Sequence, residues 1–404
     1  MLLTGAASVI CVYTFTNPVK FYEDFCRYYM IGKLGTGPNR LSFYDLQIQA
    51  QTLIDFWGGP KFPTSLAFNT PPIVIPFVAI LALFDLQPAY VIWCLVNTGL
   101  LLLGICLILS TRSVNQNKSI MIAVIFAGVL ASVPGATNTA EGQAAGIICG
   151  LIAIFFWAFQ QKRHILCGVI LGLITFKFQY LPFLVVPVLV AQRWKTFALM
   201  VLTDLLLLGA TTLAIGVPNI FSYPAFVLKI ESDPNFIGLI DPTSMTNLKG
   251  LIEALYPAVG LKFSFVLLIV AMLALAKIWS DTANRNDAFP WAVSLTVVVA
   301  LMFSPHTHNY DNILLVIPFL YACPYLTLAE SFAVKSLPLK LWNVILILLP
   351  ALTWALRFMD TNPLALKCLS QIVINCLLLL LAAINYARGA TVTTQSQEME
   401  TKTA

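Results

Sequence analysis

The apolar stretch PIVIPFVAILALF, residues 72–84, decides the fold, because the direction of every later membrane segment depends on whether this stretch crosses the bilayer. It contains Pro76 in its middle and is followed by Asp85 and Pro88. Proline disrupts a continuous helix, so the stretch alone does not settle whether it crosses. The answer has to come from the charges of the surrounding loops.

The composition is that of a membrane protein. Of the 404 residues, 59% are hydrophobic and only 10% are charged, with a mean hydropathy of +0.85. Soluble domains are typically about 45–50% apolar and about 25% charged. We therefore expect a single transmembrane domain over residues 1–390, surrounded by membrane lipids, and a disordered cytoplasmic tail over 391–404. The net charge of +5 is spread over loops and does not indicate a nucleic-acid partner.

Twelve apolar segments predict an all-α polytopic fold of about twelve transmembrane helices. The first, MLLTGAASVICVYTF, lacks the basic start and the cleavage site of a signal peptide, so it is interpreted as a membrane helix. The segments are residues 1–15, 88–110, 119–134, 143–160, 165–176, 180–192, 196–217, 260–278, 287–304, 309–326, 341–357 and 366–386.

Basic residues give the orientation. The turns TRSVNQNK (111–118), QQKRH (160–164) and QRWK (192–195) each carry two basic residues, whereas GATNTAEGQ (135–143) and SPHTHNYD (304–311) carry no Lys or Arg. The positive-inside rule places the first three turns in the cytoplasm and the other two on the outer face. This alternation holds only if 72–84 does not cross, and both termini are then cytoplasmic.

The same topology gives two long outer loops, residues 16–87 and 218–259. Long loops opposite tight turns indicate that function lies on the outer face. Many polar side chains are expected near that face, where charged groups at membrane depth tend to line functional sites. The candidates are Asp24, Arg27, Asp45, Glu141, Gln143, Lys177, Gln179, His306, His308, Tyr310 and Asp311.

Asp24 lies just past the first helix, among the aromatic residues of KFYEDFCRYY. It is either a general base in an aromatic-lined cleft or a solvated acid in an interfacial aromatic belt. Glu23 beside it is an equally available carboxylate. Lys177, between two short apolar runs, either reaches the surface or neutralises a lipid phosphate.

The histidines of SPHTHNYD can donate hydrogen bonds to phosphate or sugar oxygens, whereas an H-x-H in a turn is a weak metal signal. We expect no metal and no cofactor. The alternative is that this stretch only ends one helix and starts the next. Glu141, Gln143 and Asn138 could bind sugar hydroxyls, or Asn138 or Thr139 could cap a helix with Gln143 nearby. Asp204 is an intramembrane acid without an assigned role.

In order along the chain, the motifs D-F-x-x-Y-Y, F-Y-D, P-P-I-V-I-P-F, E-G-Q, G-L-I-T-F-K-F-Q-Y-L-P-F and F-S-P-H-T-H-N-Y-D resemble family 87 of the glycosyltransferases over roughly residues 16–326. The family includes polyprenol-phosphate-mannose-dependent mannosyltransferases. The resemblance implies a GT-C fold with juxtamembrane helices on the outer face. One departure is that the histidines stand at 306 and 308 with no Trp between Pro305 and His308, unlike the S-P-x-S-W-x-H-H form of the mannosyltransferases.

The resemblance also implies an activity. A hexose, mannose in the best-known members, would move from a polyprenyl-phosphate carrier to a lipid or glycan acceptor on the periplasmic side of the plasma membrane. Asp24 would be the base of an inverting single displacement. Lys177, Gln179, Arg27, His306 and His308 would bind the donor phosphate or sugar. The acceptor side would hold Asp45, Glu141, Gln143, Tyr310 and Asp311.

The alternatives are a twelve-helix transporter and a flippase for lipid-linked sugars. A transporter should place broken helices and charges near the bilayer midplane, and Asp204 is the one residue that favours it. A flippase would keep a lipid groove but tolerate the loss of Asp24.

Overall fold

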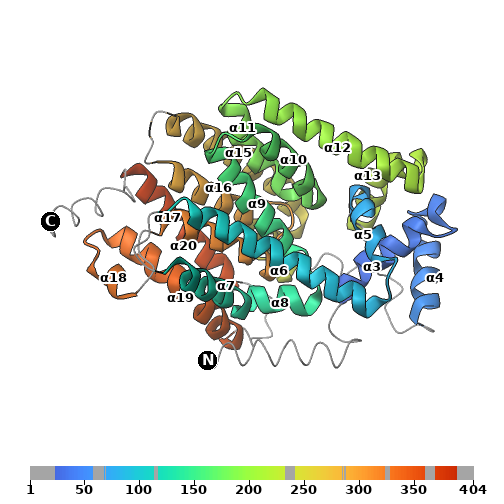
Figure 1. Ribbon diagram of the computed structural model, residues 1–404, viewed down its shortest axis with the longest axis horizontal. Coiled ribbons are helices and arrows are strands. Elements are labelled where there is room, and N and C mark those ends of the chain that lie inside the picture. The colour runs from blue at the N-terminus through green and yellow to red at the C-terminus, as the bar shows by residue number, and fades with distance from the viewer. Residues whose placement is uncertain are drawn as a thin grey trace.

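The computed structural model describes residues 23–57, 68, 70–112, 117–232, 242–283, 285, 288–323, 328–359 and 369–388. These ranges are helical, with no β-strand, and the helices form one elongated bundle (Figure 1). The predicted helix 1–15 and tail 391–404 lie outside the described residues. The α-helices are α3 (Glu23–Thr36), α4 (Leu46–Trp57), α5 (Ile75–Leu81), α6 (Leu86–Ser110), α7 (Lys118–Ala131), α8 (Val133–Glu141), α9 (Ala145–Gln160), α10 (His164–Ile174), α11 (Leu181–Val190), α12 (Trp194–Ile215), α13 (Val217–Ser232), α14 (Leu248–Leu255), α15 (Pro257–Thr282), α16 (Phe289–Phe303), α17 (Val316–Ala322), α18 (Leu328–Ala333), α19 (Leu337–Met359) and α20 (Leu369–Ala387).

Short 3₁₀ helices join several of these elements. They are η1 (Arg40–Ser42), η2 (Pro72–Val74), η3 (Thr175–Tyr180), η5 (Pro242–Ser244) and η7 (Asn309–Leu315).

Within the described ranges, six helical stretches are long and apolar enough to cross a membrane, or seven if the bent pair α7–α8 counts as one span. Their outward faces carry exposed leucine, isoleucine and valine, for example Leu206 and Leu213 on α12 and Leu273 on α15. Apolar side chains on the outside of a bundle are expected where lipid replaces water. The chain is thus an all-helical protein with several membrane-spanning helices, and the number twelve stays a prediction.

One of the six stretches, residues 164–190, folds back on itself. A straight helix over its 27 residues would be about 40 Å long and would separate its ends by that distance. Instead, Arg193 Nη1, just past the end of α11, donates to Phe159 O at the end of α9 over 2.6 Å. His164 Nδ1, at the start of α10, lies 3.3 Å from Thr196 Oγ1. Both ends therefore lie at one face, as expected for two short helices joined by FKFQY.

The packing of α10 on α12 gives the same result independently. The G-x-x-x-G pair Gly168 and Gly172 lets α10 approach α12 closely, a pattern common between membrane helices. A Cβ at Gly168 would lie 2.5 Å from Leu199 Cβ, and one at Gly172 2.5 Å from Thr203 Cβ. Residue numbers rise together along both helices, so α10 and α12 run parallel. The intervening α11 must return to the starting face.

The turns at that face share one structure. Lys162 (φ 55°) and Gln192 (φ 52°) each adopt the left-handed conformation after a helix end. The following arginines then bond backward, Arg163 N to Ala158 O and Arg193 N to Val188 O, each over 2.9 Å. This is the Schellman pattern of helix termination. The two predicted cytoplasmic turns therefore lie together, at the end of the bundle opposite the polar residues.

The stretch 72–84 forms η2 and α5, which together span about 15 Å and are too short to cross a bilayer core of about 30 Å. α5 packs on α3, where a Cβ at Gly32 would lie 2.3 Å from Val78 O. Thr211 Oγ1 of α12 donates to Pro72 O over 3.2 Å. The stretch is therefore short and packs against the bundle, and its position at the outer face stays a prediction.

The long loops are largely helical. α3 and α4 lie in the first, and α13 and α14 lie in the second. Asp24, expected in a loop, is the second residue of α3. The segment 309–326, expected to be one membrane helix, starts as the 3₁₀ helix η7 and continues as α17, which has only seven residues. Proline at 318 and the capping demands of NYDN favour short pieces over one long helix.

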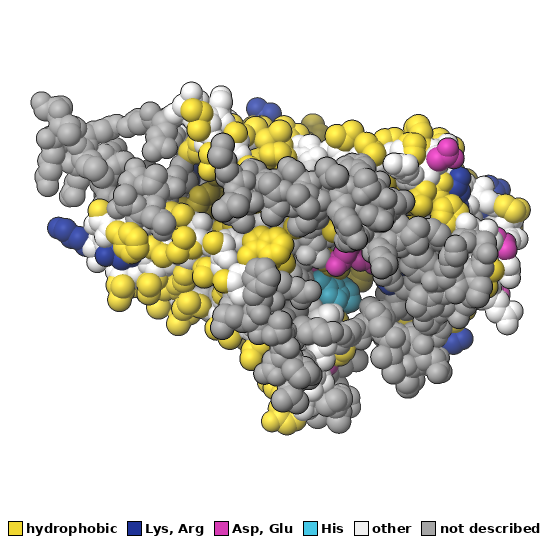
Figure 2. All heavy atoms as spheres, turned by 90° about the horizontal axis from the view of Figure 1, so that it is seen from below, with side chains coloured by type: hydrophobic (Ala, Val, Ile, Leu, Met, Phe, Trp, Pro, Cys, Tyr) yellow, Lys and Arg dark blue, Asp and Glu magenta, His cyan; other side chains and the backbone are white. Residues whose placement is uncertain are grey.

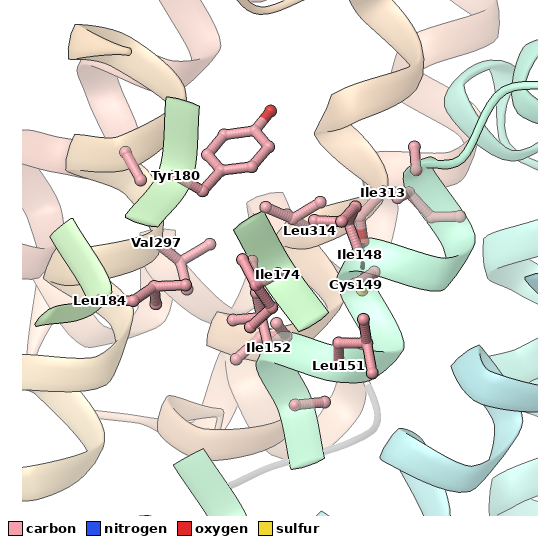
Figure 3. Close-up of a cluster of buried hydrophobic side chains, with 14 of the residues drawn as sticks. Ile148, Cys149, Leu151, Ile152, Ile174, Tyr180, Leu184, Val297, Ile313 and Leu314 are labelled. Atoms are coloured by element: carbon pink, nitrogen blue, oxygen red, sulfur yellow. Dashed lines mark hydrogen bonds between the residues drawn. The ribbon is translucent and has the colours of Figure 1, made fainter. Parts of the chain in front are cut away.

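A buried apolar layer supports the polar end of the bundle (Figure 3). It brings together Ile148, Cys149 and Ile152 of α9, Ile174 of α10, Leu184 of α11, Val297 of α16, and Ile313 and Leu314 of η7. Cys149 Sγ donates to Ile313 O over 3.6 Å. Because these helices pack tightly here, η7, which contributes Ile313 and Leu314, and η3, which joins α10 to α11, have fixed positions.

Candidate active site

Four parts of the chain bring polar side chains to one place. α3 carries Asp24 and Arg27, the turn between α8 and α9 carries Gln143, η3 carries Lys177 and Gln179, and the segment from α16 into η7 carries the histidines. We call the following set the polar cluster: Asp24, Arg27, Gln143, Lys177, Gln179, His306, His308, Tyr310 and Asp311. Imidazole and carboxylate side chains lie side by side in the middle of the face seen in Figure 2.

A glycine brings α8 against α3. Gly142 ends α8 with φ 68°, a conformation that favours glycine, and a Cβ there would lie 2.4 Å from Phe25 Cβ. Trp93 Nε1 holds the same turn by donating to Gly142 O over 2.8 Å. The next residue, Gln143, donates from its side chain to Asp24 Oδ2. The E-G-Q motif thus positions an amide on the candidate base.

Asp24 is held loosely on its other side. Its side chain is 23% exposed, and Arg27 Nη1 lies 3.6 Å from its Oδ1. Tyr28 on the same helix contacts Trp93, with ring centroids 5.0 Å apart, and stacks on Phe176 at 5.7 Å. Burial raises the pKa of Tyr28, and the negative charges of Asp24 and Asp311 raise it further. Tyr28 is therefore an uncharged phenol that lies close enough to both acids to be influenced by their charges.

The break between α10 and α11 presents Lys177. This residue has φ −124° and ψ 67°, which is not helical, and Pro182 in the first turn of α11 lacks the N–H that a continuous helix would need. Lys177 Nζ pairs with Asp311 Oδ1, and it lies 5.0 Å from the centre of the Tyr310 ring. Asp311 Oδ2 accepts from His308 N over 2.9 Å. Lys177 is therefore engaged inside the protein.

The two histidines bond to each other. Their Nε2 atoms are 2.9 Å apart, so one nitrogen donates and the other accepts. His308 Nδ1 lies 3.3 Å from Ser244 Oγ, and the Gln179 amide donates to His306 O. Burial lowers the pKa of both histidines, and the charges of Lys177, Lys249 and Arg27 lower that of His306 further. At neutral pH the pair is uncharged.

Other predicted residues lie elsewhere or do other work. Asp45 caps α4 by accepting from Gln47 N over 2.8 Å and from Ile48 N over 3.2 Å, and no contact described here joins it to the polar cluster. Glu141 ends α8, and its charge is among those that raise the pKa of Tyr310. Asn138 caps α9 through Ala145 N at 2.9 Å, so the capping alternative is confirmed for this residue.

Asp204 lies on α12 and is not one of the residues of the polar cluster. The side chain of Thr175, just past the end of α10, interacts with the Asp204 carboxyl group. Among the described residues, Asp204 Oδ1 has no hydrogen-bond partner.

Sequence reasoning missed Lys249 and Ser244, both in the second long loop. Lys249 is 8% exposed on α14, and its charge acts on His306. The signal that could have found it is a lysine within the stretch NLKGLIEAL of a loop predicted to lie on the functional face. Among the described residues, no group of three His, Cys, Asp or Glu side chains could hold a metal ion.

Comparison with known proteins adds one finding. A family model described as glycosyltransferase family 87 matches residues 68–305, which is more than half of the chain. The match includes Gln143, Lys177 and Gln179, and it ends before Asp311 and starts after Asp24, so it is narrower than the expected 16–326. No curated protein matches the chain. The chain belongs to glycosyltransferase family 87.

Proposed function

We propose that this membrane glycosyltransferase moves a hexose, mannose in the first instance, from a polyprenyl-phosphate carrier to a lipid or glycan acceptor on the outer face of the plasma membrane. The observation that carries the proposal is the position of the Asp24 carboxylate, held by Gln143 in the same cluster as Lys177, His306 and His308. A base and a phosphate-binding group are the two parts that such a transfer needs. Membership of a transferase family does not favour the transporter or flippase alternatives.

In the proposed reaction, an acceptor hydroxyl oxygen attacks the anomeric carbon. Asp24 takes the hydroxyl proton as the new carbon–oxygen bond forms. The bond from the anomeric carbon to the phosphate oxygen breaks, and its electron pair leaves with the polyprenyl phosphate. One displacement of this kind inverts the anomeric configuration. The departing phosphate gains negative charge, which neighbouring cations and imidazole N–H groups stabilise.

The depth of the polar cluster suits a lipid-linked donor. α9 runs from Gln143 at the cluster to the basic turn at the opposite end, and its 16 residues span about 24 Å. That is less than the roughly 30 Å of a bilayer core. A phosphate held at the cluster can therefore stay attached to a tail in the hydrocarbon region.

An apolar groove offers a place for that tail. A cavity of about 500 Å³ lies between α7, η7, α17 and α19, and one of its lining residues is Asn312, next to Asp311. Its walls are mainly apolar and include Val124, Gly128, Val316, Phe319 and Leu346. We propose that the prenyl chain of the donor occupies this groove. Asn312 links this groove to the histidine segment, because its side chain also donates to His308 O over 3.4 Å and to Thr246 Oγ1 over 3.2 Å.

The test of the function is transfer by the purified enzyme in proteoliposomes. It would be given polyprenyl-phosphate-mannose, polyprenyl-phosphate-glucose or a nucleotide sugar, together with a membrane lipid extract. We expect release of polyprenyl phosphate and a glycosylated lipid from a lipid-linked donor only. Turnover of a nucleotide sugar, or no turnover of any lipid-linked sugar, would contradict the proposal.

The groove has its own test. In Gly128→Phe the new side chain would enter the groove, because the nearest atom to a Cβ at Gly128 is Pro350 Cγ at 3.9 Å. We expect a higher KM for a long-chain donor and a smaller change for a donor with a short chain. Gly99→Phe on α6 is the matched control, since a Cβ there meets nothing within 4 Å. Equal effects of Gly128→Phe on both donors would place the tail elsewhere.

A further inference from the structure

The second long loop is fastened to the histidine segment. Thr246 N donates to Thr307 O over 2.8 Å, and Met245 pairs with His308 as an antiparallel bridge. Asn247 Nδ2 donates to Ser304 O over 2.9 Å, while its Oδ1 caps α14 by accepting from Gly250 N over 2.8 Å. The start of α14 is therefore fixed on the segment that carries His306 and His308.

This attachment brings a further cation to the polar cluster. Lys249 is the second residue of α14 and is 8% exposed, an unusual position for a lysine. Its charge lowers the pKa of the buried His306, after burial itself and the charges of His308 and Lys177, and before that of Arg27. A buried lysine on a helix whose start is bonded to the histidine segment can bind an anion well, because low polarity strengthens its attraction to negative charge.

The three cations differ in how firmly an acid holds them. Lys177 is in direct contact with Asp311, whose side chain is 1% exposed. Lys249 Nζ lies 3.7 Å from Glu253 Oε1, which is longer than a hydrogen bond. Arg27 is 3.6 Å from Asp24, the candidate base. The ammonium group of Lys249 is therefore better placed than that of Lys177 to bond a ligand.

We propose that Lys249 is the residue that binds the phosphate of the lipid-linked donor, whereas Lys177 acts indirectly by holding Asp311. This inference rests on the proposed function and assigns one of its roles to a residue of the second loop. The phosphate has one negative charge in the donor and gains another as the sugar leaves. Lys249 should therefore stabilise the transition state and the product more than the bound substrate.

The experiment uses Lys249→Gln in the full-length enzyme in proteoliposomes. We expect kcat to fall by about 10²-fold, as for the loss of one donor to a developing anion, with a smaller change in the KM of the donor. Inhibition by added polyprenyl phosphate should weaken as well. Lys249→Arg should retain more of kcat and of the inhibition by polyprenyl phosphate than Lys249→Gln does, because arginine keeps the positive charge.

The matched control is Lys277→Gln. Lys277 also pairs with an acid four residues on, Asp281 at 2.6 Å, but its side chain is 75% exposed on α15. The variant Lys277→Gln should leave kcat and the inhibition by polyprenyl phosphate unchanged. Because Lys249→Gln leaves Glu253 without that cation, the double variant Lys249→Gln/Glu253→Gln separates a loss of folding from a loss of phosphate binding.

The outcomes distinguish this inference from the proposed function. If wild type transfers sugar and Lys249→Gln retains both kcat and inhibition by polyprenyl phosphate, Lys249 does not bind the phosphate. If only the KM of a phosphorylated acceptor rises, Lys249 binds the acceptor head group, and the proposal is wrong. If wild type uses no lipid-linked donor, the proposed function itself fails, whatever the variant does.

Discussion

Asp24 and Asp311 are the two acids of the polar cluster, and they are held in opposite ways. Asp311 is 1% exposed and uses both oxygens, one with Lys177 and the other with His308 N at 2.9 Å. Asp24 is 23% exposed, and its Oδ2 accepts a hydrogen bond from the Gln143 amide. Among the described residues, its Oδ1 has just the longer contact with Arg27, at 3.6 Å.

The difference indicates which acid can take part in the reaction and which one has a structural role. A carboxylate whose oxygens are both engaged deep in the protein is poorly placed to take a proton from a substrate. A carboxylate with one open oxygen and an amide fixing the other can do so. We therefore infer that Asp24 acts on the acceptor and that Asp311 fixes the segment on which the histidines lie.

The largest expected effect is the loss of activity in Asp24→Asn, which tests whether Asp24 is the acid that does the chemistry. Asp24→Asn removes the base but keeps the shape, so the transfer rate should fall by about 10²–10⁴-fold with an unchanged melting temperature. Transfer of radiolabelled sugar in proteoliposomes measures the rate. The neighbouring Glu23→Gln is the control and should retain activity. Equal losses in the two variants would leave Asp24 without a special role.

The next effect concerns Asp311. In Asp311→Asn the partly buried Lys177, whose side chain is 13% exposed, loses its partner, and removing one member of a buried ion pair typically costs about 3–5 kcal/mol. We expect a marked drop in melting temperature, measured by tryptophan fluorescence in nanodiscs. The exposed pair offers the control, because Asp281→Asn should leave the melting temperature nearly unchanged. Equal melting temperatures for Asp311→Asn and Asp281→Asn would contradict the structural role assigned to Asp311.

The third prediction concerns how stability depends on pH at His306 and His308, whose segment Asp311 holds by accepting from His308 N. An unfolded histidine has a pKa of about 6.5, and burial lowers the pKa of both His306 and His308 in the fold. Below that pH the unfolded chain binds more protons, so stability should fall as the pH drops from 7.5 to 5.5. The slope can reach about 1.4 kcal/mol per pH unit for each histidine.

The check is the melting temperature of wild type and of His306→Gln/His308→Gln across this pH range. The double variant should have a flatter profile. His164→Gln, at the opposite end of the bundle, is the control and should keep the wild-type profile. A profile that is as steep without the two histidines would assign the dependence to other groups.

The smallest effect tests what orients Asp24. Gln143→Leu keeps the size of the side chain but removes the amide that donates to Asp24 Oδ2. We expect kcat to fall by less than about 10-fold, equivalent to about 1.4 kcal/mol, with folding intact. Gln143→Glu should be worse than Gln143→Leu, since it places a second negative charge beside the base. The reverse order would mean that the amide does not orient Asp24.

Much of the fold followed from the sequence. Apolar runs predicted the helices because lipid requires a continuous apolar surface, and paired basic residues predicted that the turns at 160–164 and 192–195 share a face. The hairpin 164–190 was expected from a gap of a few polar residues. The helices α3 and α14 were not placed, because their stability depends on packing against the bundle, which composition does not reveal.

The candidate site was predicted as a group but not as a geometry. Gln143, Lys177 and the histidines stand at helix ends that the topology puts on one side, so their proximity could be inferred. That Asp311 pairs with Lys177, or that Asp45 only caps α4, depends on contacts between residues far apart in the chain. Lys249 was not predicted, because the local sequence does not distinguish a loop lysine that is packed against the bundle from one that is solvated.

The pair between Lys177 and Asp311 also imposes an order on biogenesis. Lys177 emerges from the ribosome 134 residues before its partner, which at ordinary rates of synthesis means a delay on the order of ten seconds. During that interval an isolated ammonium must be kept out of hydrocarbon. A hairpin that enters the bilayer from one face and stops part of the way can remain near the insertion machinery until η7 arrives. The last third of the chain therefore completes the insertion of its middle.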